Sequence, residues 1–434
     1  MTQFLDNSRR DFLKKSLFAA GSFSVGSALP PFAGSAFAAG EKTETTGCKL
    51  GFIALTDCAP LVIAKEKGLF AKHGMPDVQV IKQASWGTTR DNLELGSGGG
   101  GIDGAHILTP MPYAMTLGLN TKGNRPVPMY VMARLNLNSQ AISVADKYRD
   151  LKIGVDAKPL KAQIDLLKRK GAPVLKVAMT FPTGTHNYWI RYWLAAAGID
   201  PDKDVSTIVV PPPQMVANMR VGNMDAFCVG EPWNQQLINQ RIGYTACTTQ
   251  DIWKDHPEKC LGMRKDWVDA NPKSARALVR AVMEAQIWCD SPANKAELAQ
   301  ILSGRNWIGA AVGDLLPRLK GDVDYGDGRK HGGDPMVFWA KNASYPWKSH
   351  DKWFLAESRR WGFLPNGVDY DKVVNQVNRS DIWRECAGMI GQAAPTTDSQ
   401  GEEKFFDGMV FNPGDPEAYL SKLAIKNLSG AKKA

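Results

Sequence analysis

The sequence predicts an α/β protein with two similar lobes that face each other across a cleft. One observation is a phrase of short apolar strand, loop and helix, which occurs near residue 50 and again near residue 174. A second is a helix followed by a short apolar strand that stops at proline, which also occurs twice. The composition agrees, because 434 residues that are 44% hydrophobic and 22% charged are typical of a globular chain with two or three packed units.

The first 38 residues are predicted to be a twin-arginine signal peptide. Arg9 and Arg10 are followed by Phe12, by small and apolar residues over 17–32, and by an Ala-Phe-Ala cleavage triplet at 36–38. We therefore expect export to the periplasm by the twin-arginine route and a mature chain that begins near Ala39. No cysteine lies at the cleavage point to take a lipid. No run of eighteen uninterrupted apolar residues occurs, which argues against a polytopic membrane protein.

The first repeated phrase predicts one strand and one helix in each lobe. Residues 50–55 are apolar, and a helical pattern follows through residue 67 and stops at Gly68. In the second copy, residues 174–179 form the strand, 183–185 the loop, and 187–197 a helix that stops at Gly198.

The second repeated phrase aligns residues 101–110 with residues 223–232. In both copies an aspartate is followed seven residues later by a proline, and helical segments precede them at 89–95 and 214–221. Helix, turn and short buried strand form a recurring α/β unit, and ligands in open α/β sheets gather at the strand ends. The repeat suggests duplicated lobes with a ligand site between them.

Two extended stretches, 135–144 and 242–251, are expected to connect the lobes and to act as a hinge. These connections predict a discontinuous lobe I of residues 48–140 plus 246–434, which includes a C-terminal helical extension. Lobe II then spans residues 141–245. In the C-terminal part we expect helices at 274–288, 294–303 and around 368–387, and a long loop at 320–345.

The motifs of enzymes are missing from the sequence. The glycine run at 96–101 has no Gly-Lys-Ser/Thr after it, so it predicts a turn at a helix end rather than a phosphate loop. No G-x-S-x-G, H-E-x-x-H or EF-hand spacing occurs, and the seven cysteines contain no C-x-x-C pair. We expect no catalytic residue, metal or cofactor, and we interpret most cysteines as small buried apolar residues. The basic residues are scattered, which argues against a nucleic-acid partner.

Four residues at the junctions of loops with helices or strands could bind a small oxyanion: Trp86, Gln140, His186 and Lys259. Each has an ordinary structural explanation on its own, as a core aromatic, a hinge amide, a helix cap or a surface charge. Together they offer indole, amide, imidazole and ammonium N–H donors, and a helix N-terminus beside His186 would add backbone donors.

Several longer segments carry a family resemblance. They are residues 55–64 (LTDCAPLVIA), 87–92 (GTTRDN), 103–113, 181–189 (FPTGTHNYW), 211–216 (PPPQMV), 230–234 (GEPWN) and 345–351 (YPWKSHD) with Trp361-Gly362. From about Cys48 to Gly391 the chain resembles the nitrate/bicarbonate substrate-binding proteins of ABC importers.

The resemblance implies a two-lobed periplasmic-binding-protein clamp of a type II-like kind, in which each lobe is a mixed sheet flanked by helices. It implies capture of nitrate, and of nitrite as well, in the interlobe cleft and delivery to the permease subunits of an ABC importer. Trp86, Gln140, His186 and Lys259 match the ligand-holding residues of the nitrate-binding members by local context. The protein would contact the membrane only through the permease.

Three alternatives stay open, and within the binding class the ligand could also be an organic oxyanion. Bicarbonate-binding relatives carry an acidic residue in the segment that matches residues 256–259 and use calcium, whereas this chain has Lys259, which favours a monovalent anion directly. Similar proteins without a signal peptide are cytoplasmic nitrate sensors that hold a regulatory partner, and the predicted signal peptide argues against that role. An exported enzyme is disfavoured by the missing motifs.

Overall fold

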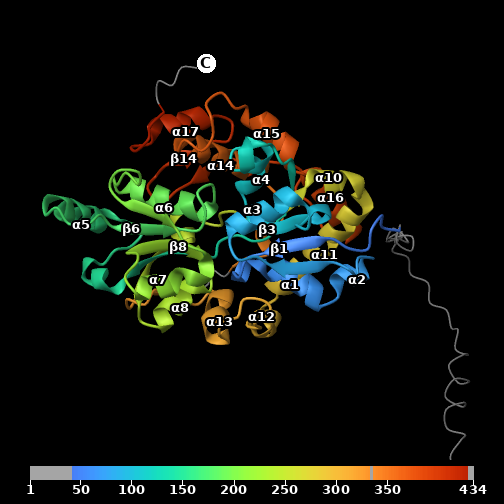
Figure 1. Cartoon of the computed structure of the whole chain (residues 1–434), viewed down its shortest axis with the longest axis horizontal. Coiled ribbons are helices and arrows are strands. Elements are labelled where there is room, and N and C mark those ends of the chain that lie inside the picture. The colour runs from blue at the N-terminus through green and yellow to red at the C-terminus, as the bar shows by residue number, and fades with distance from the viewer. Residues whose placement is uncertain (1–41, 333–335, 429–434) are drawn as a thin grey trace, which may run out of the picture. The chain divides into compact units, whose positions relative to one another are not determined.

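Two five-stranded mixed β-sheets, each flanked by helices, organise the residues that the computed structural model describes, which are 42–332 and 336–428 (Figure 1). The predicted signal peptide, residues 1–38, lies outside these described residues. The described residues belong to one compact unit. The fold is of the α/β class, with one sheet in each lobe.

The two sheets share one topology. The first has the order β2-β1-β3-β10-β4, with strands Gln79–Lys82, Lys49–Phe52, Gly104–Leu108, Lys259–Arg264 and Met129–Arg134. The second has the order β7-β6-β8-β5-β9, with strands Ser206–Val209, Lys176–Met179, Ala226–Gly230, Gln140–Ala145 and Gly243–Thr248. In both, the first three strands are parallel and the fourth is antiparallel to its neighbours. Strands β3 and β8, which the second repeat predicts, therefore occupy the same place in each sheet.

The chain passes between the sheets twice, through residues 135–139 and residues 249–258. The expected connections, 135–144 and 242–251, are wrong in extent, because β5 already begins at Gln140 and β9 spans most of the second stretch. These two strands pair with each other from Ala141–Thr248 to Ala145–Gly243. A mixture of extended polar and apolar residues fits a connection and a strand equally well, and only the pairing distinguishes them.

Local signals set the helix ends that matter for the cleft. Helix α1 (Ala59–Glu66) has Pro60 in its first turn, and Gly68 just beyond it has a φ of 67°, which favours glycine. Helix α3 (Trp86–Leu95) begins after Ser85, whose side chain accepts a hydrogen bond from a backbone N–H of the first turn at 3.1 Å.

The other helices follow the expected order along the chain. Those against the first lobe are α2 (Leu69–Lys72), α4 (Met111–Thr116), α10 (Lys265–Ala270), α11 (Pro272–Asp290) and α12 (Lys295–Leu302). Those of the second lobe are α5 (Lys158–Arg169), α6 (Thr185–Ala196), α7 (Met215–Arg220) and α8 (Trp233–Asn239), and α9 (Thr249–Ile252) lies in the return connection. Helix α13 (Val312–Lys320) packs against both α12 and α8. Short strands β11 (Val323–Asp324) and β12 (Lys330–His331) lie in the expected long loop.

The C-terminal extension packs on both lobes, which differs from its expected place in lobe I. Helices α15 (Tyr370–Val377) and α16 (Ser380–Met389) contact β4 of the first lobe, and they replace the single helix expected around 368–387. Helix α14 (Lys348–Arg360), hairpin β13–β14 (Glu403–Lys404 and Val410–Phe411) and α17 (Pro416–Lys422) place Trp353, Phe411 and Tyr419 in the core of the second lobe. Long-range aromatic packing, which local patterns do not show, sets this arrangement.

Apolar packing is continuous from one lobe to the other. The larger core contains Phe52 and Ile107 of the first sheet together with Phe227 and Trp233 of the second lobe. All seven cysteines are buried, which agrees with the prediction that most of them are small buried residues, and all seven are free. Among the described helices, none has the length and apolar character needed to cross a membrane.

The aromatic core of the second lobe yields a prediction for stability. Trp353 is fully buried, and its ring centroid lies 5.1 Å from that of Trp189 at an interplanar angle of 19° and 5.5 Å from that of Phe405. Trp353→Ala should lower the free energy of unfolding by roughly 3–5 kcal/mol, because it leaves a large cavity. Urea unfolding measures this change. Val221→Ala, at a side chain that is 69% exposed, is the control and should change it by less than about 0.5 kcal/mol. Equal effects of the two changes would contradict the prediction.

Candidate functional site

The carboxylate of Asp57 is the centre of a buried polar cluster in the cleft. Asp57 follows β1 in a short turn and is 1% exposed. It accepts hydrogen bonds from Lys259 Nζ at 3.0 Å, from Gln140 Nε2 at 3.1 Å and from His106 Nε2 at 2.6 Å. Burial alone would raise the pKa of Asp57, but Lys259 and His106 hold it well below its usual value. The carboxylate is therefore ionised.

Lys259 is the first residue of β10 and is fully buried. Its ammonium is shared between Asp57 and the carboxylate of Glu258, which lies 2.8 Å away, and it lies 5.9 Å from the ring centroid of Trp86. Burial would lower the pKa of Lys259, but these two carboxylates raise it above the usual value. Two of its three N–H bonds are used on the carboxylates, and one remains.

Two buried ring nitrogens of this cluster have no hydrogen-bond partner among the described residues: Trp86 Nε1, which carries a hydrogen, and His186 Nε2. Both side chains are fully buried. His186 lies in the first turn of α6, which begins at Gly184 without a side-chain cap. Burial, and then the charge of Lys259, hold the pKa of His186 well below its usual value, so the imidazole is neutral. Its Nδ1 atom is paired with the hydroxyl of Thr180.

The lobes approach each other closely at this helix end. A Cβ atom placed on Gly184 would lie 2.6 Å from Leu108 Cδ1, at the end of β3 in the other lobe. Only glycine fits such an approach without a shift of the neighbouring side chain. The open N-terminus of α6, with its positive end of the helix dipole, therefore lies at the lobe interface.

The structure thus places three of the four predicted residues, Trp86, Gln140 and Lys259, around Asp57. The fourth, His186, lies close enough to Lys259 and Asp57 for their charges to act on its pKa. Gln140 and Lys259 are the first residues of β5 and β10, which hold the same position in the two sheets.

The two carboxylates of the cluster, Asp57 and Glu258, are not among the residues predicted from the sequence. Asp57 lies in the loop after a predicted strand, where ligand residues of α/β sheets gather, and Glu258 directly precedes Lys259. Neither was predicted, because the candidate residues were chosen as hydrogen-bond donors to an anion, and an ionised carboxylate is only an acceptor. Thr180, Thr185 and Trp189 were also missed, since their contacts depend on how α6 meets the other lobe.

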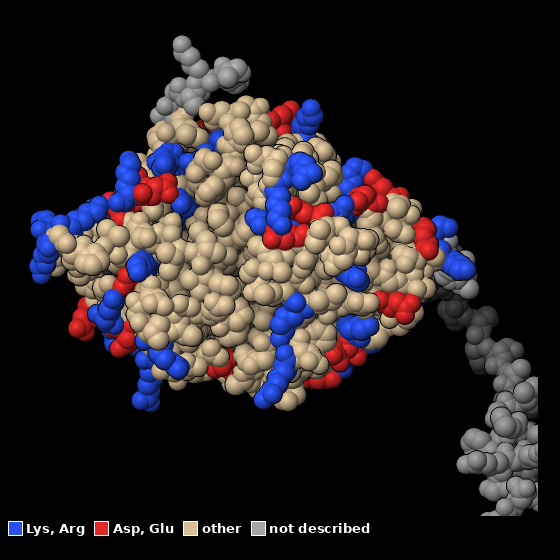
Figure 2. All heavy atoms as spheres, viewed as in Figure 1, with Lys and Arg blue, Asp and Glu red and all other residues tan. Residues whose placement is uncertain are grey.

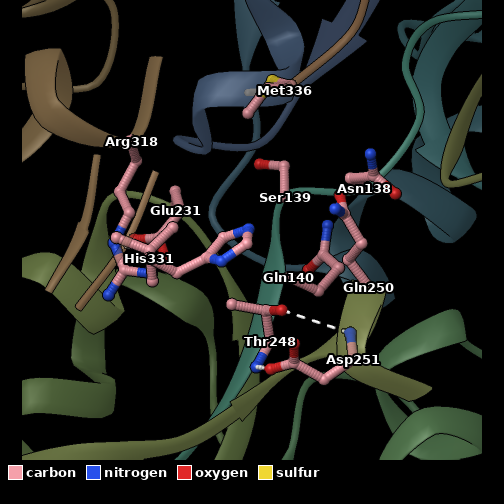
Figure 3. A pocket seen from close by; sticks show the side chains of 11 residues that line it. Asn138, Ser139, Gln140, Glu231, Thr248, Gln250, Asp251, Arg318, His331 and Met336 are labelled. Carbon is pink, nitrogen blue, oxygen red and sulfur yellow. Dashed lines mark hydrogen bonds and ion pairs between the residues drawn. The ribbon is translucent and has the colours of Figure 1, made fainter. Parts of the chain in front are cut away.

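Gln140 also borders a cavity beside the two interlobe connections (Figure 3). In this view Ser139 and Gln140 lie near the centre, Thr248 and Asp251 below them, and Arg318 next to Glu231 on the left. The Arg318 guanidinium is 3.5 Å from the Glu231 carboxylate. We call this the hinge cavity. Gln140 lines it and also belongs to the polar cluster around Asp57.

Within residues 42–332 and 336–428, no group of three or more His, Cys, Asp or Glu side chains is placed to hold a metal ion.

Comparison with known proteins gives consistent matches. A sequence model of the NMT1-like family matches residues 41–303. The nitrate/nitrite binding protein NrtA of Synechocystis is 58% identical over 391 residues, which are 89% of this chain and 86% of that protein. The crystal structure of the periplasmic nitrate-binding protein NrtA from Synechocystis superposes with a TM-score of 0.86 at 57% identity and covers 89% of this chain and 100% of that one. The bicarbonate-binding protein CmpA of Synechococcus elongatus is 43% identical, over 88% of each chain.

The buried histidines predict how stability depends on pH. Burial lowers the pKa of His106, lowers that of His186 strongly, and lowers that of His256 to about 3. The unfolded chain takes up protons at these positions near pH 6.5 while the folded chain does not, so stability is lost as the pH falls below 6.5. Each histidine contributes up to about 1.4 kcal/mol per pH unit.

Urea unfolding of the wild type and of His256→Gln between pH 7.5 and pH 5 measures this slope. The variant should lose stability less steeply with acid, while the two curves run parallel above pH 7. Identical slopes below pH 6.5 would contradict the assignment of His256.

Proposed function

The chain belongs to the NMT1-like family and, within it, to the group of nitrate/nitrite-binding and bicarbonate-binding proteins, and from this premise we propose that it captures nitrate in the cleft between its lobes. It binds nitrite at the same site and delivers its anion to the permease subunits of an ABC importer. Its role is binding rather than catalysis. Of the two ligand classes in the group, the higher identity to the nitrate/nitrite-binding protein favours nitrate over bicarbonate.

One observation carries the choice of ligand: two fully buried ring nitrogens, Trp86 Nε1 and His186 Nε2, lack partners among the described residues and lie beside a buried ammonium. The third N–H bond of Lys259 and the second amide hydrogen of Gln140 complete a set of four donors. Nitrate offers three oxygens in a plane and no hydrogen, so a site made of donors suits it. Trp86 and Lys259 come from one lobe, and Gln140 and His186 from the other.

We assign the hydrogen of the Thr180 hydroxyl to its bond with His186 Nδ1, which makes Nε2 the protonated nitrogen of the ring. A neutral imidazole carries one N–H, and which nitrogen holds it depends on the partner of the other. When Thr180 donates its hydrogen to Nδ1, the proton of the ring is on Nε2, which then donates toward the anion. Thr180 therefore orients the imidazole as a donor.

Closure of the lobes around the ligand follows from the burial of the site. The four side chains are at most 1% exposed. Contacts across the cleft include the hydrogen bond from Trp233 Nε1 to the Ala54 carbonyl at 3.0 Å and that from the Thr56 amide to the Glu231 carbonyl at 2.7 Å. Nitrate can enter or leave only when the lobes separate, so occupancy is coupled to the closed form that the permease would recognise.

Titration of the mature chain, starting at Ala39, tests the ligand. Nitrate has four heavy atoms, and about 1.5 kcal/mol per atom gives roughly 6 kcal/mol, or a Kd of tens of micromolar, which charge-assisted bonds can improve. Calorimetry should show binding of nitrate and nitrite, and none of bicarbonate with or without calcium. Calcium-dependent bicarbonate binding in place of nitrate binding would overturn the proposal.

Lys259→Glu should abolish nitrate binding, because it adds a third carboxylate to the cluster and removes its ammonium. Lys170→Glu makes the same charge change at an exposed position just beyond α5, where Figure 2 shows basic side chains at the end of the second lobe. This control should bind nitrate as the wild type does. Unchanged affinity in Lys259→Glu would refute the assignment of the site.

Export by the twin-arginine route rests on the sequence of the first 38 residues and agrees with the periplasmic location named for the similar crystal structure. Changing Arg9 and Arg10 together to lysine should leave the uncleaved precursor in the cytoplasm, since that route reads the arginine pair. Cell fractionation measures this, with Lys14→Arg and Lys15→Arg as the control pair. Normal export of the double-lysine variant would contradict the predicted route.

A further inference from the structure

Glu258 is a buried carboxylate that both lobes hold. It accepts hydrogen bonds from Lys259 Nζ at 2.8 Å, from Thr185 Oγ1 at 3.0 Å and from Trp189 Nε1 at 2.5 Å. Lys259 belongs to the first sheet, whereas Thr185 and Trp189 belong to α6 of the second lobe. The carboxylate therefore fastens the first turns of α6, which carry His186, to the strand that carries the ammonium.

The charges around the ammonium are unusual for an anion site. Among the described lysines and arginines, Lys259 alone has an ion pair with Asp57 or Glu258, and neither of these carboxylates is more than 1% exposed. The histidines near it, His106 and His186, are neutral because burial lowers the pKa of both. The two carboxylates therefore outnumber the ammonium, and these three groups carry a net charge of −1 before any ligand binds.

The second negative charge of a dianionic ligand is costly to bury in this site. The negative charge of a monoanion is compensated by the donors that remain on Trp86, His186, Gln140 and Lys259. A dianion would bring another full charge into a dry cleft beside two carboxylates, with no further cation in contact to balance it. Burial and the nearby charge of Asp57 raise the pKa of Glu258 above its usual value, although Lys259 and Trp189 oppose that rise.

We propose that Glu258 is a specificity-determining residue that restricts the site to monovalent anions. Glu258 acts through the ammonium of Lys259, which also contacts Asp57. It acts as well through α6, whose Thr185 and Trp189 side chains donate hydrogen bonds to it. This inference rests on the proposed function, because it concerns the same cleft. It predicts discrimination by charge that is separate from discrimination by shape.

Chlorate and sulfite are the two competing ligands of the test, because both are pyramidal oxyanions with three oxygens and differ by one charge. Competition against nitrate is measured at about pH 8.5, where sulfite is a dianion. Glu258→Gln keeps the size of the side chain and removes its charge, and electrostatic interaction with a ligand scales with the ligand's charge. The sulfite-to-chlorate affinity ratio should rise by about tenfold or more in this variant.

Glu231→Gln is the matched control. Glu231 is also a buried carboxylate, but it pairs with Arg318 in the hinge cavity and has no contact with Lys259. This variant should keep the sulfite-to-chlorate ratio of the wild type. A folded Glu258→Gln that binds nitrate and keeps the wild-type ratio would overturn the proposal.

A second variant decides the question if Glu258→Gln does not fold. Trp189→Phe keeps the aromatic packing and removes one donor to the carboxylate, which favours its protonated, uncharged form. The ratio should shift in the same direction by a smaller factor, and an unchanged ratio would again overturn the proposal. Absence of nitrate binding in the wild type would instead refute the proposed function, so the two failures are distinguishable.

Discussion

The ion pair between Lys259 and Asp57 is the interaction on which the site depends. Both charges are withdrawn from water, and a buried pair is tolerated only when its geometry and its remaining hydrogen bonds are good. The contacts of Asp57 with His106 and Gln140, and of Lys259 with Glu258, supply those bonds. The ends of β1, β3, β5 and β10 must therefore meet at one point, which ties the positions of the two sheets to the chemistry of the cleft.

The repeated topology explains how one point receives groups from both lobes. In each sheet the fourth strand, β5 or β10, begins directly after a connection between the lobes, and its first residue is Gln140 or Lys259. In each sheet the strand that pairs with the third strand in parallel, β1 or β6, is followed by a loop that carries Asp57 or leads to His186. Two equivalent pairs of positions therefore build the site, and they carry different side chains in the two lobes.

Sequence patterns predicted the parts of this arrangement that are local. The strand, loop and helix phrases, the strands at β3 and β8 and the helix stops at Gly68 and Gly198 depend on neighbouring residues, so they could be found. The C-terminal extension could not be assigned correctly, because Trp353 and Tyr419 reach the second core through contacts with distant segments. Asp57 and Glu258 escaped for a chemical reason, since acids beside an anion site make sense only once the buried ammonium between them is known.

The indole of Trp189 connects the buried polar cluster around Asp57 to the aromatic core of the second lobe. Its N–H donates to Glu258, while its ring stacks on Trp353 of α14 and contacts His256 at a centroid distance of 4.4 Å. Helix α14 is in turn fixed to the first lobe by the buried ion pair between Asp351 and Arg134 of β4. Any movement of α6 away from Glu258 must also disturb this stack or carry α14 with it. Opening of the cleft therefore involves the C-terminal extension as well as the two interlobe connections, and the closed form owes part of its stability to residues far from the anion.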